Sequence, residues 1–338
     1  MTTTAVLLVN LGTPDRPTTA AVRRYLREFL SDRRVIDLPA ALWRPILELG
    51  VLSVRPSRSA AKYRSVWSPD GSPLMVHTRA QAAALRAALG DRAEVAIAMR
   101  YGATAIADVV AGLVGRGCER LLVVPLYPQY AGSSTGTVLD RVHEVIAKLP
   151  RHPEVRTVRS FADDPGYIDA LCAALDERWR RFGRPDPAAG DRVLLSYHGI
   201  PLAMARAGDP YPDECARTTA AVTRRLGLPA GTIVTAFQSR FGPAPWLAPA
   251  TIDTVAELGA AGCRRLEVVC PGFVSDCLET LEEIRLLNAE VYRDAGGRGF
   301  AYLPWGNARP AWTRALAALV GAHLWQPAVQ EVSSGAGR

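Results

Sequence analysis

Short runs rich in Val, Leu and Ile alternate with longer alanine-rich stretches along most of the chain. Seven of the runs predict β-strands, at residues 5–11, 93–101, 120–128, 154–161, 192–198, 232–240 and 265–271. Amphipathic helical spacing occurs between them, at residues 18–30, 78–89, 105–117 and 248–262. Strands that alternate with helices predict βα units and parallel sheets. The strands are apolar at nearly every position, which is typical of sheets covered by helices on both faces.

One helix-and-strand segment occurs twice without a gap. ADVVAGLVGRGCERLLVVP (107–125) aligns with IDTVAELGAAGCRRLEVVC (252–270), and both contain a Gly-Cys-x-Arg-Leu junction. A shorter pair, VLLVNLGTP (6–14) and VLLSYHGIP (193–201), repeats a strand and the turn after it. We therefore predict an α/β protein made of two similar Rossmann-like lobes.

A segment rich in Pro, Gly and Asp at residues 181–192 predicts the boundary between the lobes. The first lobe would cover residues 1–182, the second 190–325, and residues 326–338 would form a flexible tail. Ligands of open α/β sheets bind outside the carboxyl ends of the strands, so we expect a cleft between the two lobes at these ends.

The two copies differ first where Leu11 in one corresponds to His198 in the other. His198 directly follows a predicted strand, at the carboxyl edge of the sheet, and Gly199 permits a tight turn. A histidine at such a place often does no more than bond a loop carbonyl. Alternatively, its imidazole serves as a base or as a metal ligand near neutral pH.

The second difference follows the repeated strand, where Ser134 and Val138 of the first copy become Glu279 and Glu283. With Asp276, these carboxylates have the spacing i, i+3 and i+7, which predicts an acidic stripe along one helix face. A capping box explains Asp276 and Glu279 equally well, and a solvated face explains Glu283. At the same sheet edge as His198, the three carboxylates would suit Fe(II) binding or proton transfer.

Composition narrows the classes of protein. Hydrophobic residues make up 49% of the 338 residues and charged residues 22%, as in globular proteins. The six scattered cysteines contain no C-x-x-C pair, which favours a reduced, cytoplasmic setting. We expect no signal peptide and no membrane span. The net charge of +7 suits anionic partners, but no nucleic-acid motif accompanies it, and we predict no nucleic-acid binding. Dinucleotide and P-loop fingerprints are absent from the sequence.

Several segments together resemble the ferrochelatase family, whose members insert iron into porphyrin. The similarity runs along nearly the whole chain, through LLVNLGTPDRPTTAAVRRYLREFLSDRRVIDLP, AMRYGATAI, LYPQYAGSSTGTVLDRV, LLSYHGIPLAMARAGDPY, FQSRFGPAPWLAPATIDTVAELGAAG and VVCPGFVSDCLETLEEI. The resemblance implies a two-lobed Rossmann-like fold, a porphyrin metal chelatase (a lyase) and Fe(II) as a substrate. It places the metal pair at His198 and Glu279, with Glu283 and Asp276 extending an acidic path. It places the porphyrin against Leu11, Arg100, Tyr101, Pro201 and Trp246.

The resemblance also implies a hydrophobic lip at about residues 38–67, with an apolar face that contacts a membrane or the substrate. Trp43, Leu47, Leu49, Val51 and Leu52 would supply that face. Some members of the family hold a [2Fe–2S] cluster through cysteines in an added tail or insert. The last cysteine here is Cys277, and four cysteine ligands are needed, so we predict no cluster and no required cofactor. The short tail predicts a monomer.

Two alternatives stay open at this point. The porphyrin would be protoporphyrin IX, giving protohaem in the last step of haem synthesis, or coproporphyrin III, which has four propionates instead of two. A non-catalytic porphyrin or haem carrier would need no acidic residues facing a histidine. For His198, the roles of proton acceptor and first iron ligand both remain open.

Overall fold

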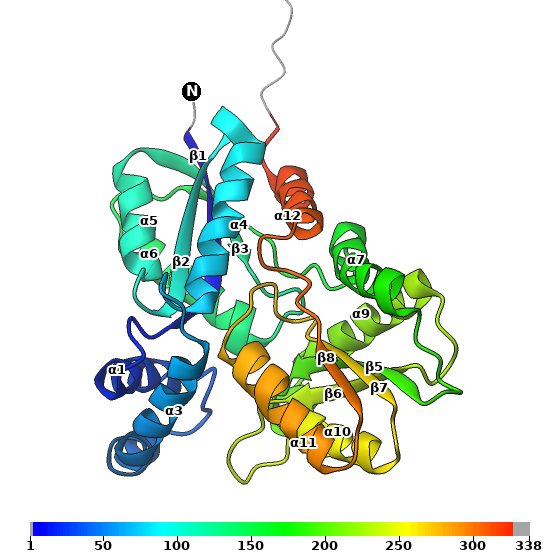
Figure 1. The fold of residues 1–338 in the computed structure, drawn as a ribbon. Coiled ribbons are helices and arrows are strands. Elements are labelled where there is room, and N and C mark those ends of the chain that lie inside the picture. Colours follow the sequence, from blue (N-terminus) through cyan, green and yellow to red (C-terminus); the bar gives the residue numbers. More distant parts are fainter. Residues whose placement is uncertain (1–2, 327–338) are drawn as a thin grey trace, which may run out of the picture.

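Two four-stranded parallel sheets with the same strand order form the centre of the molecule (Figure 1). A computed structural model describes residues 3–326. The first sheet has the order β2-β1-β3-β4 and the second the order β6-β5-β7-β8. The strands are β1 (Thr3–Thr13), β2 (Glu94–Gly102), β3 (Cys118–Pro125), β4 (Glu154–Thr157), β5 (Asp191–His198), β6 (Ile233–Gln238), β7 (Arg265–Val269) and β8 (Gly299–Tyr302). The predicted pair of similar α/β lobes is confirmed, with β8 as an eighth strand beyond the seven predicted.

Helices cover both faces of each sheet. The α-helices are α1 (Thr19–Leu30), α2 (Ala40–Pro45), α3 (Leu52–Val66), α4 (Pro73–Leu89), α5 (Ile106–Gly115), α6 (Thr137–Ile146), α7 (Pro165–Phe182), α8 (Leu202–Arg206), α9 (Tyr211–Leu226), α10 (Thr251–Ala260), α11 (Ala289–Asp294) and α12 (Pro310–His323). Three π-helices, η1 (Ile46–Val51), η3 (Gly132–Gly136) and η4 (Glu279–Asn288), and a 3₁₀ turn, η2 (Gly90–Arg92), complete the chain.

The internal repeat corresponds to real structural equivalence. The aligned segments fold as α5–β3 and α10–β7, and β1 and β5 are the equivalent central strands. Both lobes then continue into a π-helix, η3 or η4, at corresponding positions of the repeat. Leu11 and His198 lie at equivalent strand ends, as the sequence predicts.

The lobes exchange helices and share one core. α7, which precedes the expected boundary, packs against α9 of the second lobe and against α12 (Figure 1). The chain then ends with α12, which returns to pack against α4 of the first lobe. A single buried cluster contains Val6 and Leu8 of β1 together with Val193 and Leu195 of β5. The segment at 181–192 therefore joins two sheets that share their apolar interior.

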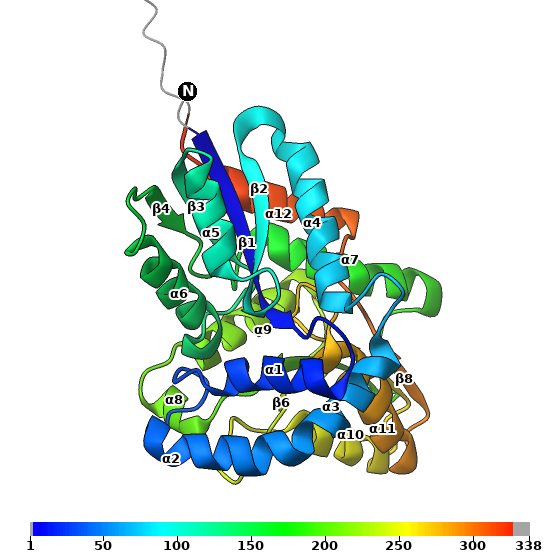
Figure 2. The ribbon, with the colours of Figure 1, turned by 90° about the vertical axis from the view of Figure 1, so that its left-hand side faces the viewer.

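The lip consists of α2, η1 and α3, which lie beside α1 below the ends of the first sheet (Figure 2). Leu47 and Leu52 are each only 1% exposed and belong to the cluster under α1, so their prediction as part of an outward apolar face is wrong. Buried and exposed apolar side chains alternate along these helices. The exposed large apolar side chains in this segment, including one just before α2, are Leu38, Leu42, Ile46, Leu49 and Val54. Within residues 3–326, no helix combines the length and apolarity needed to cross a bilayer.

Candidate active site

A cavity of about 650 Å³ opens at the carboxyl ends of the strands, where the sequence places the cleft. Elements of both lobes contribute to its wall, including the ends of β1, β5 and β6, the helices α1 and α3, and the π-helices η3 and η4. Of the nine predicted site residues, six line it: Leu11, His198, Pro201, Trp246, Glu279 and Glu283. The volume suits a drug-sized or cofactor-sized organic molecule.

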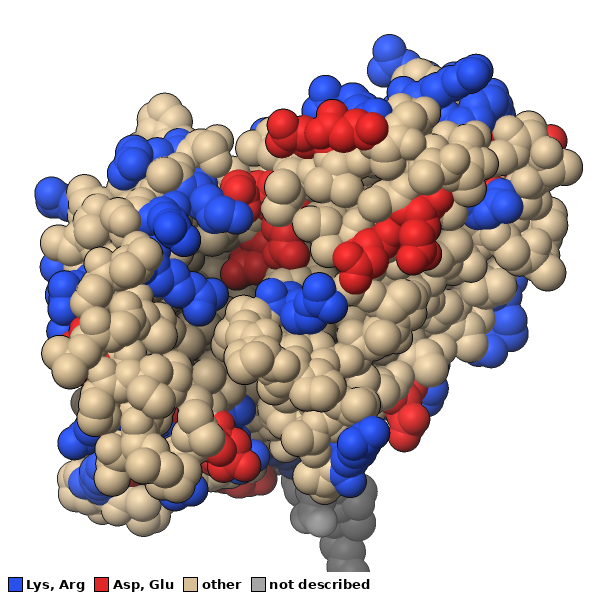
Figure 3. All heavy atoms as spheres, turned by 90° about the horizontal axis from the view of Figure 1, so that it is seen from below, with Lys and Arg blue, Asp and Glu red and all other residues tan. Residues whose placement is uncertain are grey.

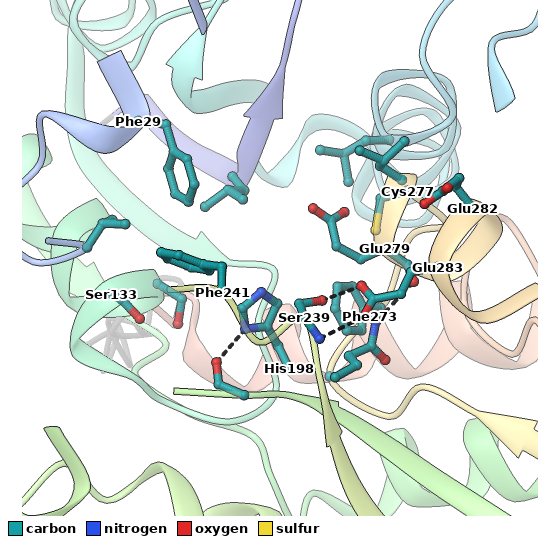
Figure 4. A pocket seen from close by; sticks show the side chains of 18 of the residues that line it. Phe29, Ser133, His198, Ser239, Phe241, Phe273, Cys277, Glu279, Glu282 and Glu283 are labelled. Carbon is teal, nitrogen blue, oxygen red and sulfur yellow. Dashed lines mark hydrogen bonds between the residues drawn. The ribbon is translucent and has the colours of Figure 1, made fainter. Parts of the chain in front are cut away.

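The hydrogen bonding of His198 determines which of its nitrogens is available. Nδ1 lies 2.6 Å from the carbonyl oxygen of Gly199 (Figure 4). A carbonyl oxygen can only accept, so Nδ1 carries the proton, and in the neutral ring the lone pair is on Nε2. The first alternative given above, a histidine that bonds a loop carbonyl, is therefore confirmed for Nδ1. The same bond prepares Nε2 for proton transfer or for metal binding.

The turn after His198 needs glycine because other groups lie against it. The Gly199 N–H donates to the carbonyl of Gln238 over 2.8 Å. A Cβ at Gly199 would lie 3.0 Å from that carbonyl oxygen and 3.1 Å from the Trp246 ring. Pro201 and Trp246 are joined by an isolated β-bridge, so the turn is held between two walls of the cavity. The sequence HGIP thus positions the imidazole on a rigid edge.

Glu279 and Glu283 come from η4, a π-helix with i→i+5 hydrogen bonds, in which residues four apart lie nearly above one another. Gln238 anchors the start of this helix: its Nε2 donates to the backbone carbonyl of Glu279 over 3.0 Å. The Oε1 of Gln238 accepts from the buried Ser196 hydroxyl over 2.7 Å, which orients the amide. In Figure 4 both carboxylates lie in the cavity wall with His198 near them.

Ser239 gives the carboxylate of Glu283 two hydrogen bonds. The Ser239 N–H donates to Oε1 over 2.7 Å, and its hydroxyl donates to Oε2 over 2.6 Å. Burial raises the pKa of Glu283 above its ordinary value, although both bonds and the charge of His198 favour ionisation. The charge of Glu279 raises the pKa further, which makes Glu283 a better proton acceptor than an ordinary glutamate.

Three groups near Glu279 hold their protons more strongly than usual. Burial raises the pKa of Tyr25 and of Tyr63 well above the ordinary tyrosine value, and the charge of Glu279 adds to both shifts. The thiol of Cys277 also has a raised pKa, first from burial and then from Glu279. Tyr25, Tyr63 and Cys277 all line the cavity, and their raised pKa values keep them protonated near neutral pH.

A family model described as Ferrochelatase matches residues 3–324. Two relatives named Ferrochelatase are half identical to the chain. That of Azoarcus sp. (strain BH72) is 50% identical over 315 residues, covering 93% of this chain and 85% of the relative. That of Methylibium petroleiphilum (strain ATCC BAA-1232 / LMG 22953 / PM1) is 49% identical over 323 residues, covering 95% and 88%. The chain belongs to the ferrochelatase family. It is therefore an enzyme of haem synthesis that places a metal ion in a porphyrin, and the suggested alternative of a non-catalytic carrier is set aside.

Solved structures of lower identity show the same fold. SirB from Bacillus subtilis with Fe3+ is 13% identical with a TM-score of 0.51, covering 95% of each chain. The sirohydrochlorin chelatase SirB from Bacillus subtilis subspecies spizizenii in complex with cobalt is 12% identical with a TM-score of 0.54, also covering 95% of each chain. At these identities the likeness supports the two-lobed α/β architecture.

Asp276 lies outside the cavity wall, which corrects the predicted acidic stripe. Helix η4 begins near Leu278 and Glu279, so Asp276 precedes it and helical spacing does not apply. Its Oδ1 accepts from Thr280 over 2.8 Å and from the Tyr302 hydroxyl over 2.5 Å, and Oδ2 accepts from Asn307 over 2.7 Å. In this structure Asp276 fastens the start of η4 to β8 and to the loop after it.

Arg100 and Tyr101 also lie outside the cavity wall, contrary to expectation. Both bind Asp32, which follows α1. Arg100 Nη2 donates to Asp32 Oδ2 over 2.5 Å, and the Tyr101 hydroxyl donates to the same oxygen over 2.8 Å. Arg100 also donates to Thr137 over 2.7 Å. Burial opposes the ionisation of Asp32, but hydrogen bonds from the Thr137 hydroxyl, the Arg34 N–H and the Tyr101 hydroxyl, together with the charge of Arg100, outweigh it and lower its pKa. The pair thus holds the end of α1, whose Phe29 packs against Tyr101 and lines the cavity.

Sequence reasoning missed the basic residues of the cavity. Arg55, Arg58 and Lys62 line it from α3, and Arg240 lines it from the loop after β6. The segment VRPSRSAAKYR contained the signal for this. Its residues Arg55, Arg58 and Lys62 have the spacing i, i+3 and i+7, which places them on one helix face. In the view from below, basic and acidic side chains border a hollow in this face (Figure 3).

The metal ion is a substrate of this family, and few side chains in the cavity could act as ligands to it. Within residues 3–326 no three His, Cys, Asp or Glu side chains are grouped to hold a metal ion. His198 and Glu279 line the same cavity, one with an imidazole and the other with a carboxylate.

Proposed function

We propose that this enzyme inserts Fe(II) into protoporphyrin IX, with His198 and Glu279 as the residues that face the reacting centre. The observation that carries the proposal is the shared cavity: the lone pair of His198 Nε2 and the Glu279 carboxylate belong to one wall of a cavity large enough for an organic ring system.

In the proposed reaction, a free-base porphyrin loses two pyrrole protons as Fe(II) enters its centre. Neutral His198 accepts one proton at Nε2. Glu279 contacts the incoming iron and offsets its charge, and Glu283, with its raised pKa, accepts the second proton and passes it on. Aromatic and apolar side chains such as Leu11, Phe29 and Trp246 hold the ring in a bent form that is closer to the transition state.

The distribution of charge in the cavity supports protoporphyrin IX over coproporphyrin III. Arg55, Arg58 and Lys62 come from one helix face, whereas Arg240, on the loop after β6, lies 3.9 Å from the carboxylate of Asp253. The two propionates of protoporphyrin IX lie on one edge of the ring and suit one-sided basic residues. Two of the four propionates of coproporphyrin III would face the apolar side chains or Glu279, at a cost in desolvation and repulsion.

Anaerobic assays with Fe(II) and each porphyrin test the substrate directly. We expect kcat/KM for protoporphyrin IX to exceed that for coproporphyrin III by at least about tenfold, since one unpaired buried carboxylate costs more than 1.4 kcal/mol. A preference for coproporphyrin III would reverse the assignment of the substrate.

The roles of the residues are tested by His198→Ala and Glu279→Gln. Both should lose turnover by at least about a hundredfold and keep porphyrin binding, because the ring is held mainly by other residues. Fluorescence quenching of the bound porphyrin measures the binding. Normal turnover in His198→Ala would refute its role, and a Glu279→Gln variant with only a lower Tm would indicate that Glu279 merely stabilises the helix.

We also propose a peripheral contact of the lip with the cytoplasmic face of a membrane. The supporting observation is the exposure of Leu49 (80%), Leu42 (64%) and Ile46 (53%) on one short segment. Leu49→Asp should reduce sedimentation with anionic vesicles, whereas Phe182→Asp, which alters an exposed apolar residue on the distant α7, should not. Equal sedimentation of both variants and the parent protein would contradict the contact.

The absence of an iron–sulfur cluster, the monomeric state and the lack of nucleic-acid binding stay predictions. The six cysteines lie buried on separate elements or loops. The tail of residues 327–338 lies outside the described residues. An absorption spectrum without iron–sulfur bands and a mass of one chain by light scattering would support the first two, and passage through a DNA column at physiological salt would support the third.

A further inference from the structure

An ion pair joins the two lobes across the cavity. Lys62 Nζ on α3 lies 2.8 Å from Glu282 Oε2 on η4, and both residues line the cavity. The Lys62 side chain is 46% exposed and that of Glu282 only 17%. The pair therefore links the lip to the π-helix that carries Glu279 and Glu283.

The pair lies where a basic wall meets an acidic wall. Arg55 and Arg58 line the cavity from the same helix as Lys62, and Arg55 is already engaged over the ring of Phe241, 5.3 Å from its centroid. On the facing helix, Glu279 and Glu283 line the cavity beside Glu282. In this arrangement the ammonium of Lys62 contacts Glu282 Oε2, where another cation would otherwise bind.

We propose that a carboxylate of the porphyrin takes Lys62 from Glu282, so that porphyrin binding releases Glu282 to attract Fe(II). The inference rests on the proposed function, because it requires a porphyrin with carboxylates in this cavity. It orders the two substrates: in the empty enzyme Glu282 is paired with Lys62, and in the enzyme that holds the porphyrin Glu282 is free in the cavity wall that Glu279 and Glu283 also line. Glu282 then attracts Fe(II) only in the enzyme that already holds the porphyrin.

The energetics allow this exchange. A half-exposed lysine–glutamate pair changes an equilibrium by no more than about fivefold, so a substrate carboxylate can replace Glu282 at low cost. Glu282 is much less exposed than Lys62, so the carboxylate left behind is poorly hydrated and attracts a divalent cation.

Fe(II) binding by anaerobic titration calorimetry tests the proposal without turnover. The cavity is filled with a palladium(II) porphyrin that has two propionates and cannot exchange its metal, or with its dimethyl ester. We expect the dicarboxylate to tighten Fe(II) binding by about three- to fivefold and the ester to leave it unchanged. Lys62→Met should bind Fe(II) more tightly by a similar factor when empty, and should no longer respond to the dicarboxylate.

Two further variants complete the test. Glu282→Gln should lose the response to the dicarboxylate while binding that porphyrin at least as tightly, because its Lys62 is released. Lys148→Met breaks the exposed pair with Glu144 on α6, at 2.7 Å, and should behave as the parent protein. Equal Fe(II) affinity with and without the dicarboxylate, or a Lys62→Met variant identical to the parent, would overturn the exchange. If iron insertion persists in that case, the function stands and the exchange alone is wrong.

Discussion

Removing the Ser239 hydroxyl should raise the pKa of Glu283 further. Ser239 gives Glu283 two hydrogen bonds, and Ser239→Ala deletes the one from the hydroxyl, at 2.6 Å, while the backbone bond at 2.7 Å remains. Such a bond favours the ionised carboxylate, and a hydrogen bond to a charged group contributes about 1.5–3 kcal/mol. Water that enters the cavity will replace part of it, so the lower figure applies. One pKa unit equals about 1.4 kcal/mol, and we expect an upward shift of about one unit.

Infrared titration measures this shift directly. The C=O band of protonated Glu283 is assigned by its loss in Glu283→Gln, and its midpoint is followed with pH in the parent protein and in Ser239→Ala. The acid limb of the turnover profile should move to higher pH, because a protonated Glu283 cannot accept a proton. Ser133→Ala removes a hydroxyl from the opposite lobe of the same cavity and should leave the midpoint unchanged. An unchanged or lowered midpoint in Ser239→Ala would refute the account of Glu283.

Three other substitutions test the surroundings of the site. Gly199→Ala should lower the free energy of unfolding by about 1–3 kcal/mol in urea titrations, because its Cβ would meet Gln238 and Trp246; unchanged stability would show that the turn can yield. Tyr302→Phe should lower stability by about 1–3 kcal/mol by removing a donor to Asp276, and should keep most of the turnover; a selective loss of turnover would return Asp276 to the reaction. Trp312→Ala should cost about 3–5 kcal/mol in one cooperative transition, and separate melting of the lobes would contradict the shared core.

The part of the site that depends on strand ends could be predicted from sequence. Apolar runs marked the strands, and the repeat identified Leu11 and His198 as equivalent positions at a carboxyl edge. Parallel strands bring such positions together whatever the details of packing. Glu279 and Glu283 were found for a similar reason, because they follow the repeated strand.

The predictions that failed depended on where helices begin and on which way side chains point. Asp276 has helical spacing from Glu279 but precedes the first helical turn, and sequence patterns locate such boundaries poorly. Arg100 is basic and near the strand end, yet Asp32, 68 residues away in the chain, binds it. Leu47 and Leu52 look like lip residues, but the neighbouring α1 buries them. Each outcome was decided by a contact distant in sequence.

The position of α12 has a consequence for synthesis of the protein. This helix is the last one in the described chain, yet it covers α4 and α7 and supplies Trp312 to the interior common to both sheets (Figure 1). A nascent chain that has left the ribosome as far as α7 must therefore expose an apolar surface until some 130 further residues have been made. At synthesis rates of about 5–20 residues per second, that interval lasts roughly 6 to 26 seconds. For that whole time the apolar surface that α12 covers in the finished protein stays exposed, and exposed apolar surface makes a partly made chain prone to aggregate.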